Sequence, residues 1–420
     1  MVQPRSKVLL AILIAAIVVA SLLLASVYFW DDEESSPVEE TVRIQSDEQL
    51  ASSEYVTTGD GTEDNPYIME DTAFAVSDDP QSGDDYGLMI SGTESHLVIR
   101  ALTFEPSPSV DVSIYPGEFY YGIALSSVHN VTVIQCEFGS LYCGVRVSGK
   151  SEVNITTNTF RTCTVGVLLR EWDGDSMPYS SVTLWGNEFN ECGYAVEMMR
   201  WWYTEVLDNT FRSCDVGVGG WDTYGSIIMG NEASSSRMAS VHLTGGGFAS
   251  IGDNRFSDDL SESIKLASVS HVTVSNNTVA TPGCGVLISK SDNVSVIDND
   301  IERHWYDDYP AVNIGVYILL STAVNVTWNS VSNMAVGVAV VTNDDFPSYV
   351  NVHHNSFASN QVSAIDTGGA GNSWDDGVSV GNYWDDYPGL DDDEDGIGDT
   401  PYLIDGDSLD RYPLMSYPVR

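Results

Sequence analysis

The stretch VNITTNTFRTCTVGVLLR, residues 153–170, holds most of one unit of a pattern that repeats along the chain. Within it, Asn158 stands two positions before Phe160, and an Asn-like residue followed by an apolar residue returns every 22 to 30 positions. The apolar positions are Phe138, Phe160, Phe189, Phe211, Ala233, Phe256, Val279, Ile301, Val331 and Phe357. A unit of about 22 residues with occasional insertions predicts a solenoid.

The unit itself consists of short β-strands. Runs such as 131–134 and 272–274 alternate β-branched residues, and each is followed by a second run such as 166–169 or 285–288. Two or three strands with tight corners account for about 22 residues, and successive coils then stack at about 4.8 Å. The predicted fold is all-β: a parallel β-helix, right-handed because strand crossovers nearly always are.

Three columns of residues follow the same period. The repeated Asn predicts a structural ladder of stacked side-chain amides rather than an active site. A small residue six places after the apolar position, as at Gly144 and Gly166, indicates a corner that needs φ > 0 or has no room for a side chain. Cys163, Cys192 and Cys214 share one phase, so we expect buried structural thiols, one pair of which is close enough to oxidise if the Cβ geometry permits.

The N-terminus predicts a membrane anchor. An uncharged, apolar stretch from Val8 to Trp30 follows Arg5 and Lys7; at 1.5 Å per residue it spans about 34 Å, enough to cross a bilayer. Positive charge before the stretch and an acidic cluster after it place the N-terminus in the cytoplasm and the body outside the cell. A cleaved signal peptide is the alternative.

The charge balance limits the partners. The 61 acidic residues outnumber 17 Lys and Arg, for a formal net charge of −44, which argues against nucleic acid or anionic lipid as partners of the body. The predicted order is a transmembrane anchor (1–30), an acidic linker (31–40), an N-terminal cap with the first strands (41–85), the β-helix (86–383) and an acidic C-terminal cap (384–420).

The two ends of the solenoid carry signatures of a known family. The segment GDGTEDNPYI at 59–68, and GNYWDDY at 381–387 followed by residues 391–402, resemble NosD-like right-handed β-helix proteins of the archaeal cell-surface type. The resemblance implies the β-helix fold. It leaves the activity open, because such proteins include copper-site maturation factors, surface-layer-associated proteins and carbohydrate-processing modules.

The C-terminal cap contains a candidate calcium loop. Asp391, Asp393, Asp395 and Asp399, with Gly396 turning the chain, follow the oxygen-ligand spacing that suits Ca²⁺. Copper is not expected, since copper sites need clustered His, Met or Cys. The neighbours His353 and His354 belong to a predicted strand, in which adjacent side chains point to opposite faces.

Insertions at one corner of three consecutive coils carry the functional candidates. They bring Trp172, Trp201, Trp202 and Trp221 to one side, which predicts an aromatic strip for sugar rings; a buried satellite core is the alternative. Carboxylates and arginines near the same corner are weak catalytic candidates: Glu171, Asp173, Asp175, Glu197, Asp222, Arg170 and Arg200.

The sequence therefore favours a membrane-anchored extracytoplasmic protein that binds or organises surface carbohydrate without catalysis. A polysaccharide lyase, hydrolase or epimerase acting on acidic glycans is the first alternative, and an accessory protein of copper-enzyme maturation is the second. Neither the glycan nor a transporter partner can be identified from the sequence.

Overall fold

The computed structural model describes residues 37–38, 41–76, 85–107, 120–170, 180–304, 313–342, 348–367, 371–406 and 408–418. The body, Pro37–Arg420, is one compact unit. The predicted anchor (1–30) lies outside the described residues. Within the described part of the chain, we find no helix that is both long and apolar enough to cross a membrane.

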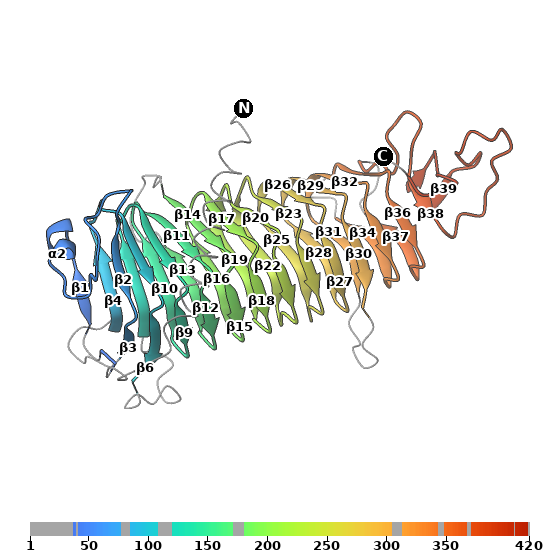
Figure 1. Cartoon of the computed structure of the whole chain (residues 1–420). Helices are drawn as coiled ribbons and strands as arrows, with labels where there is room; N and C mark the ends of the chain where they lie inside the picture. Colours follow the sequence, from blue (N-terminus) through green and yellow to red (C-terminus); the bar gives the residue numbers. More distant parts are fainter. Residues whose placement is uncertain are drawn as a thin grey trace. The chain divides into compact units, whose positions relative to one another are not determined.

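The body is a stack of coils that place their strands in three parallel columns, here called sheets 1, 2 and 3 (Figure 1). Sheet 1 consists of β1 (Val42–Ile44), β4 (Asp85–Ser91), β7 (Tyr120–Ser126), β10 (Cys143–Ser148), β13 (Val165–Arg170), β16 (Tyr194–Met199), β19 (Val216–Tyr224), β22 (Ala239–Gly247), β25 (Glu262–Ala267), β28 (Cys284–Ser289), β31 (Ile314–Leu319), β34 (Val336–Val341) and β37 (Val362–Asp366).

Sheet 2 consists of β2 (Tyr67–Glu70), β5 (Leu97–Arg100), β8 (Val131–Ile134), β11 (Glu152–Thr156), β14 (Ser181–Trp185), β17 (Thr204–Leu207), β20 (Ile227–Met229), β23 (Ser250–Gly252), β26 (Ser270–Ser275), β29 (Asp292–Ile297), β32 (Thr322–Thr327) and β35 (Val350–His353). A single pairing between Gly247 and Ser270 joins sheets 1 and 2.

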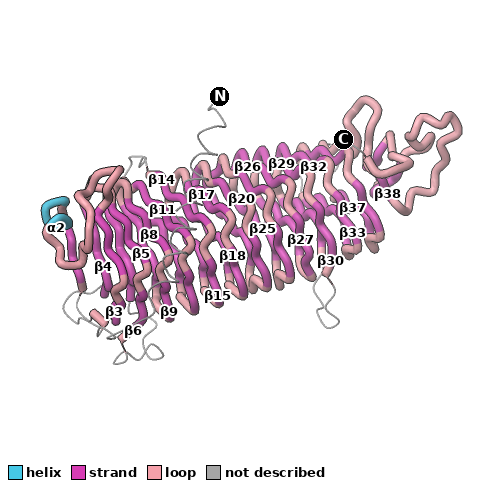
Figure 2. Tube along the Cα trace, viewed as in Figure 1, coloured by secondary structure: helices cyan, strands magenta, loops and turns pink. Residues whose placement is uncertain are grey.

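Sheet 3 consists of β3 (Ala73–Val76), β6 (Thr103–Pro106), β9 (Glu137–Gly139), β12 (Thr159–Arg161), β15 (Glu188–Asn190), β18 (Thr210–Arg212), β21 (Glu232–Ser234), β24 (Arg255–Ser257), β27 (Thr278–Thr281), β30 (Asp300–Arg303), β33 (Ser330–Ser332), β36 (Ser356–Ala358) and β38 (Tyr383–Trp384). Figure 2 shows the strands of successive coils side by side, with short loops at the corners.

The predicted register is confirmed in sheet 3. Phe160 pairs with Phe138 on one side and Phe189 on the other, and the ring centroids stack at 4.7 and 4.6 Å. Strand alternation supplies the rest of the core: in β11, Val153 and Ile155 are buried while Asn154 between them is exposed. The repeat read from the sequence is therefore the repeat of the coils.

The asparagine ladder is also present. The Asn158 side-chain amide donates to Asn187 Oδ1 at 3.0 Å, and the same bond continues from Asn187 to Asn209 at 2.9 Å. The bonds run through the later coils to Asn382, whose backbone N–H donates to the carboxylate of Asp410 at 2.7 Å. A carboxylate at that end accepts without needing a further coil, so it terminates the ladder.

The corners differ in one detail from the expectation. Left-handed residues stand at the corners, as at Thr157 with φ 52°, directly before the ladder Asn, and at Thr162 with φ 53°, directly after sheet 3. Gly144 and Gly166 are needed for space instead, since a Cβ at Gly144 would lie 2.6 Å from the Phe160 ring. Of the two reasons that the sequence allowed for a small residue, close packing is the correct one.

The cysteine column is buried and reduced. Cys163, Cys192 and Cys214 all lie in the core, and all six cysteines of the chain are free. The hydrogen bond with Cys163 raises the pKa of Cys192 to about 12, with burial adding to that shift and the bond with Cys214 opposing it. Such thiols are structural rather than reactive.

Two short elements complete the ends of the solenoid. The helix α2 (Asp47–Ala51) begins at Ser46, whose hydroxyl accepts from the backbone N–H of Gln49, and it buries Leu50. At the other end, the antiparallel hairpin of β39 (Tyr402–Asp405) and β40 (Ser408–Asp410) places Tyr402 on Trp384 at 4.5 Å. These end elements cover the otherwise open core.

Candidate functional site

Trp201 is not part of an exposed strip. Its side chain is 0% exposed within the main core, and its indole N–H has no hydrogen-bond partner among the described residues. Arg200 before it is left-handed, with φ 51°, so the chain turns and the next side chain points inward. The predicted sugar-stacking role of Trp201 is therefore wrong; the residue is buried, as the alternative supposed, but in the main core rather than in a satellite cluster.

The other tryptophans occupy different positions. Trp172 lies outside the described residues. Trp202 is partly exposed and stacks on Tyr224 at 4.3 Å, whereas Trp221 is partly exposed on the outer side of β19. The aromatic surface is therefore smaller than the predicted strip.

The catalytic candidates do not form a carboxylate pair within the described part of the chain. Glu171, Asp173 and Asp175 lie outside it. Arg200 and Asp222 directly follow the register partners Met199 and Trp221 and are exposed, left-handed corner residues of adjacent coils. Arg170 is the last residue of β13, on another coil, and its charge opposes the rise in the pKa of Glu197 that burial causes.

A different group gathers on the outer side of sheet 1, across β16, β19, β22 and β25. We call it the outer row: Glu197, Gly219, His242 and Lys265 are consecutive register partners, with Tyr194, Trp221 and Glu262 beside them. Apart from Trp221 and Glu197, sequence reasoning missed these residues. The four register partners stand eight or nine positions after the apolar residue of their repeat, so aligning the repeats at that offset would have found the row.

The rings of Tyr194 and Trp221 lie above Gly219, the position of the row that has no side chain. A Cβ built at Gly219 would lie 3.0 Å from the Tyr194 ring and 3.2 Å from the Trp221 ring. The two rings meet edge to face at 5.4 Å, and Trp221 is 6.1 Å from the His242 ring. The two rings thus cover Gly219 and form a small, partly exposed aromatic surface.

Ionisable groups flank the rings on both sides. Burial raises the pKa of Glu197, and the charge of Arg170 partly opposes that shift. Burial and then the charge of Lys265 lower the pKa of His242, which keeps its imidazole neutral. The ring Nε2 lies 3.2 Å from the Thr244 hydroxyl, and the Lys265 amine is 3.8 Å from Glu262. These groups offer hydrogen bonds and one loosely paired cation.

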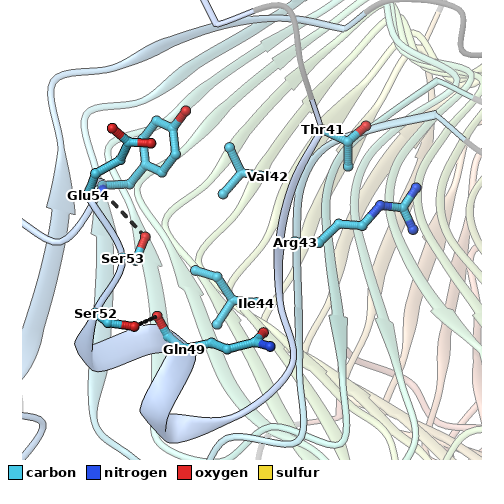
Figure 3. Close-up of a pocket in the computed structure, with 9 residues that line it drawn as sticks. Thr41, Val42, Arg43, Ile44, Gln49, Ser52, Ser53 and Glu54 are labelled. Atoms are coloured by element: carbon cyan, nitrogen blue, oxygen red, sulfur yellow. Dashed lines mark hydrogen bonds between the residues drawn. The ribbon is translucent and has the colours of Figure 1, made fainter.

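Figure 3 shows a pocket elsewhere, between β1 and the α2 region at the N-terminal end of the body. Its volume is about 480 Å³, and residues 41–44, 49 and 52–55 line it. It contains none of the predicted site residues.

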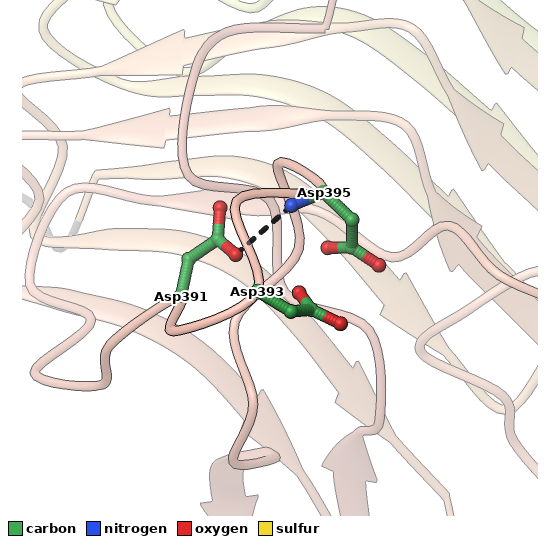
Figure 4. A group of neighbouring side chains, drawn as sticks. All are labelled: Asp391, Asp393 and Asp395. Atoms are coloured by element: carbon green, nitrogen blue, oxygen red, sulfur yellow. Dashed lines mark hydrogen bonds between the residues drawn. The ribbon is translucent and has the colours of Figure 1, made fainter.

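The acidic loop of the C-terminal cap brings three carboxylates together (Figure 4). Ligand atoms of Asp391, Asp393 and Asp395 lie within 4.8 Å of one another. The charge of Asp395 raises the pKa of Asp393, as expected for crowded carboxylates. Asp399 is not in this group; its carboxylate accepts from the backbone N–H of Asp392 at 2.7 Å and so closes the loop.

Stacked three-strand coils with an internal asparagine ladder define a parallel β-helix. Comparison with known proteins identifies the family to which this β-helix belongs. Residues 43–232 and 221–389 match the family described as "Periplasmic copper-binding protein (NosD)". The chain belongs to this NosD family of right-handed parallel β-helix proteins. No curated protein matches the chain.

Solved structures with the same fold have low sequence identity. A mutant of the periplasmic alginate epimerase AlgG is 12% identical with a TM-score of 0.51, covering 73% of this chain and 83% of its own. The Azotobacter vinelandii mannuronan C-5 epimerase AlgE4 A-module is 14% identical with a TM-score of 0.50, covering 73% and 90%. A GH87 α-1,3-glucanase catalytic domain is 12% identical with a TM-score of 0.50, covering 83% and 71%.

Because the family is described as copper-binding, the question is whether the described residues could hold a copper ion. The argument that adjacent histidines point apart is wrong here: His354 is left-handed, with φ 59°, and His353 Nδ1 lies 2.7 Å from His354 Nδ1. Two nitrogens do not complete a Cu²⁺ site, which takes four ligands in a plane. Within the described residues, no group of three His, Cys, Asp or Glu side chains includes this pair. His353 and His354 by themselves therefore do not make up a copper centre.

Proposed function

We propose that the protein is an extracytoplasmic β-helix, held at the membrane by residues 1–30, that binds surface carbohydrate on the outer row of sheet 1. The observation that carries the proposal is the pair of partly exposed rings, Tyr194 and Trp221, over Gly219. Aromatic rings of this kind pack against the C–H faces of sugars, while the flanking polar groups bond hydroxyls.

Two comparisons support this proposal. The family is described as periplasmic, which agrees with an exported body. The structural neighbours are described as an alginate epimerase, a mannuronan epimerase and a glucanase crystallised with tetrasaccharides. These are carbohydrate-active proteins built on the same fold, so a carbohydrate-binding face is compatible with this architecture.

The experiment is a binding assay with the purified full chain and a panel of polysaccharide fragments. Trp221→Ala removes one stacking ring, which is worth about 1 kcal/mol, so affinity is expected to fall about 5-fold. Trp185→Ala is the matched control, because Trp185 is also partly exposed but lies in sheet 2. Equal loss in both variants, or no binding by the wild type to any fragment, would reject the proposal.

Catalysis is the alternative that the outer row supports. Glu197 has a raised pKa and His242 stays neutral, and they lie two coils apart on either side of Gly219. An acid and a base flanking a sugar are what a lyase, epimerase or hydrolase needs. Incubating the same fragments with the full chain decides between the two functions: new chain ends or altered stereochemistry would make the protein an enzyme.

We also propose that the loop 391–399 binds Ca²⁺. Three clustered carboxylates repel one another, and a cation relieves that repulsion. Calcium at 100 times its Kd would stabilise the folded state by about 2.7 kcal/mol, so a chelator is expected to lower the melting temperature by several degrees.

Asp393→Ala should remove the effect of the chelator. Asp392→Ala, in the same loop but outside the carboxylate group, should retain it. Identical melting of the wild type with and without Ca²⁺ would show that the loop is a solvated acidic turn.

A further inference from the structure

The outer side of sheet 1 around the outer row is less acidic than the chain as a whole. Across β10 to β25, the outer side of sheet 1 carries Arg146, Arg170 and Lys265 against Glu197 and Glu262, with Asp222 at the adjoining corner. The whole chain has 61 acidic and 17 basic residues. This face is therefore close to neutral on a strongly acidic molecule, and an anion meets less repulsion here than elsewhere.

Lys265 is the cation of this face that stands in the outer row itself, as the register partner of His242. Its 3.8 Å contact with Glu262 is the longest ion pair among the described residues. By contrast, Arg161 and Arg212 pair with Glu137 and Glu188 along sheet 3. The Lys265 side chain is 32% exposed and that of Glu262 only 19%, so the amine is the more open of the two groups.

The outer row also runs across successive coils, and the distance between its residues suits the repeat of a polysaccharide. Gly219, His242 and Lys265 lie on successive coils, so each step along the row is about 4.8 Å. A pyranose unit in an extended polysaccharide has a similar length. A sugar packed on the Tyr194 and Trp221 rings therefore has its neighbours over the adjacent coils, where the long Lys265 side chain is placed to meet a substituent of the unit at His242.

We propose that the carbohydrate bound on the outer row is anionic, with Lys265 as the charge partner of its carboxylate or sulfate group. This inference rests on the proposed carbohydrate binding and specifies its ligand class. His242 contributes hydrogen bonds without adding charge. Glu197 and Glu262 are the opposing charges of the row, and the Lys265 contact offsets one of them.

The test uses pairs of probes that differ only in charge. Oligogalacturonate is compared with its methyl ester, and dextran sulfate with dextran, on the purified full chain at low and high salt. We expect the charged member of at least one pair to bind at least 10-fold more tightly at low salt, and the difference to shrink as salt screens the charges. The pair that responds tells carboxylate from sulfate.

Lys265→Gln is expected to weaken binding of that charged probe about 5- to 10-fold and to leave its neutral counterpart unchanged. The control is Lys290→Gln, which removes the same charge from an exposed corner that follows β28. Trp221→Ala should weaken binding of charged and neutral probes alike.

Different results would overturn the proposed carbohydrate binding and the inference that the carbohydrate is anionic. If charged and neutral probes bind equally and Lys265→Gln has no effect, while Trp221→Ala still weakens both, the ligand is a neutral glycan and the charge inference is overturned. If no probe binds the wild type, carbohydrate binding and the charge inference are both overturned.

Discussion

Replacing Asn209 with alanine is expected to lower the free energy of unfolding by at least about 3 kcal/mol. Asn209 is 1% exposed, and its Oδ1 accepts both from the backbone N–H and from the side-chain amide of Asn187 at 2.9 Å. Its own amide donates to Leu184 and Leu207 carbonyls and to Asn231. Alanine leaves several of these buried groups without a partner at once, and each costs about 1 to 3 kcal/mol.

The matched control is Asn154→Ala, because Asn154 is an exposed residue of β11 in the same part of the solenoid. Denaturant unfolding of both variants, followed by circular dichroism, measures the difference. A variant at Asn209 as stable as the Asn154 variant would mean that the ladder amides contribute no more than solvent-exposed ones. The result matters for the whole fold, since the same bond recurs from coil to coil.

Trp201→Ala is expected to destabilise the protein by about 3 to 5 kcal/mol, the usual cost of emptying a buried aromatic site. Trp201 is fully buried in the main core, so its removal leaves a cavity that the rigid coils around it fill only in part. The unbonded indole N–H of Trp201 reduces the loss slightly, because its desolvation is also removed.

Trp221→Ala separates stability from binding. Trp221 is partly exposed on the outer side of β19, so the same substitution there should cost less stability and should weaken carbohydrate binding. Thermal melting and fragment binding are measured on both variants. If Trp201→Ala melted with the wild type and lost carbohydrate binding, the residue would be exposed, and the burial described above would be wrong.

The repeat made most of the fold predictable. Asn158 and Phe160 mark a corner and the buried position after it, and every later coil repeats the pair closely enough to fix which residues stack. Interactions that recur between neighbouring coils require similar residues at the same position of each unit, so the repeats can be aligned with one another. The burial of Cys163, Cys192 and Cys214 followed from this comparison as well.

The candidate site was much less predictable. Spacing placed Trp201 and Trp221 at one corner, but one left-handed residue, Arg200, turns the side chain of Trp201 into the core. The same effect brings His353 and His354 together although adjacent strand residues normally point apart. His354 directly precedes the ladder residue Asn355, a corner position that is also left-handed at Thr157, so its positive φ belongs to the repeat although the residue type does not indicate it.

The sequence by itself determined the parallel coils, their register and the asparagine and phenylalanine columns, because these depend on strand alternation and on contacts between identical positions. Only the tertiary structure decided which aromatic rings remain on the surface and which charges stand beside them. Glu197, Gly219, His242 and Lys265 come from four coils and share an offset within the repeat but no residue type. They form one row only because successive coils stack at the spacing of paired strands, which sets residues about 22 positions apart next to one another.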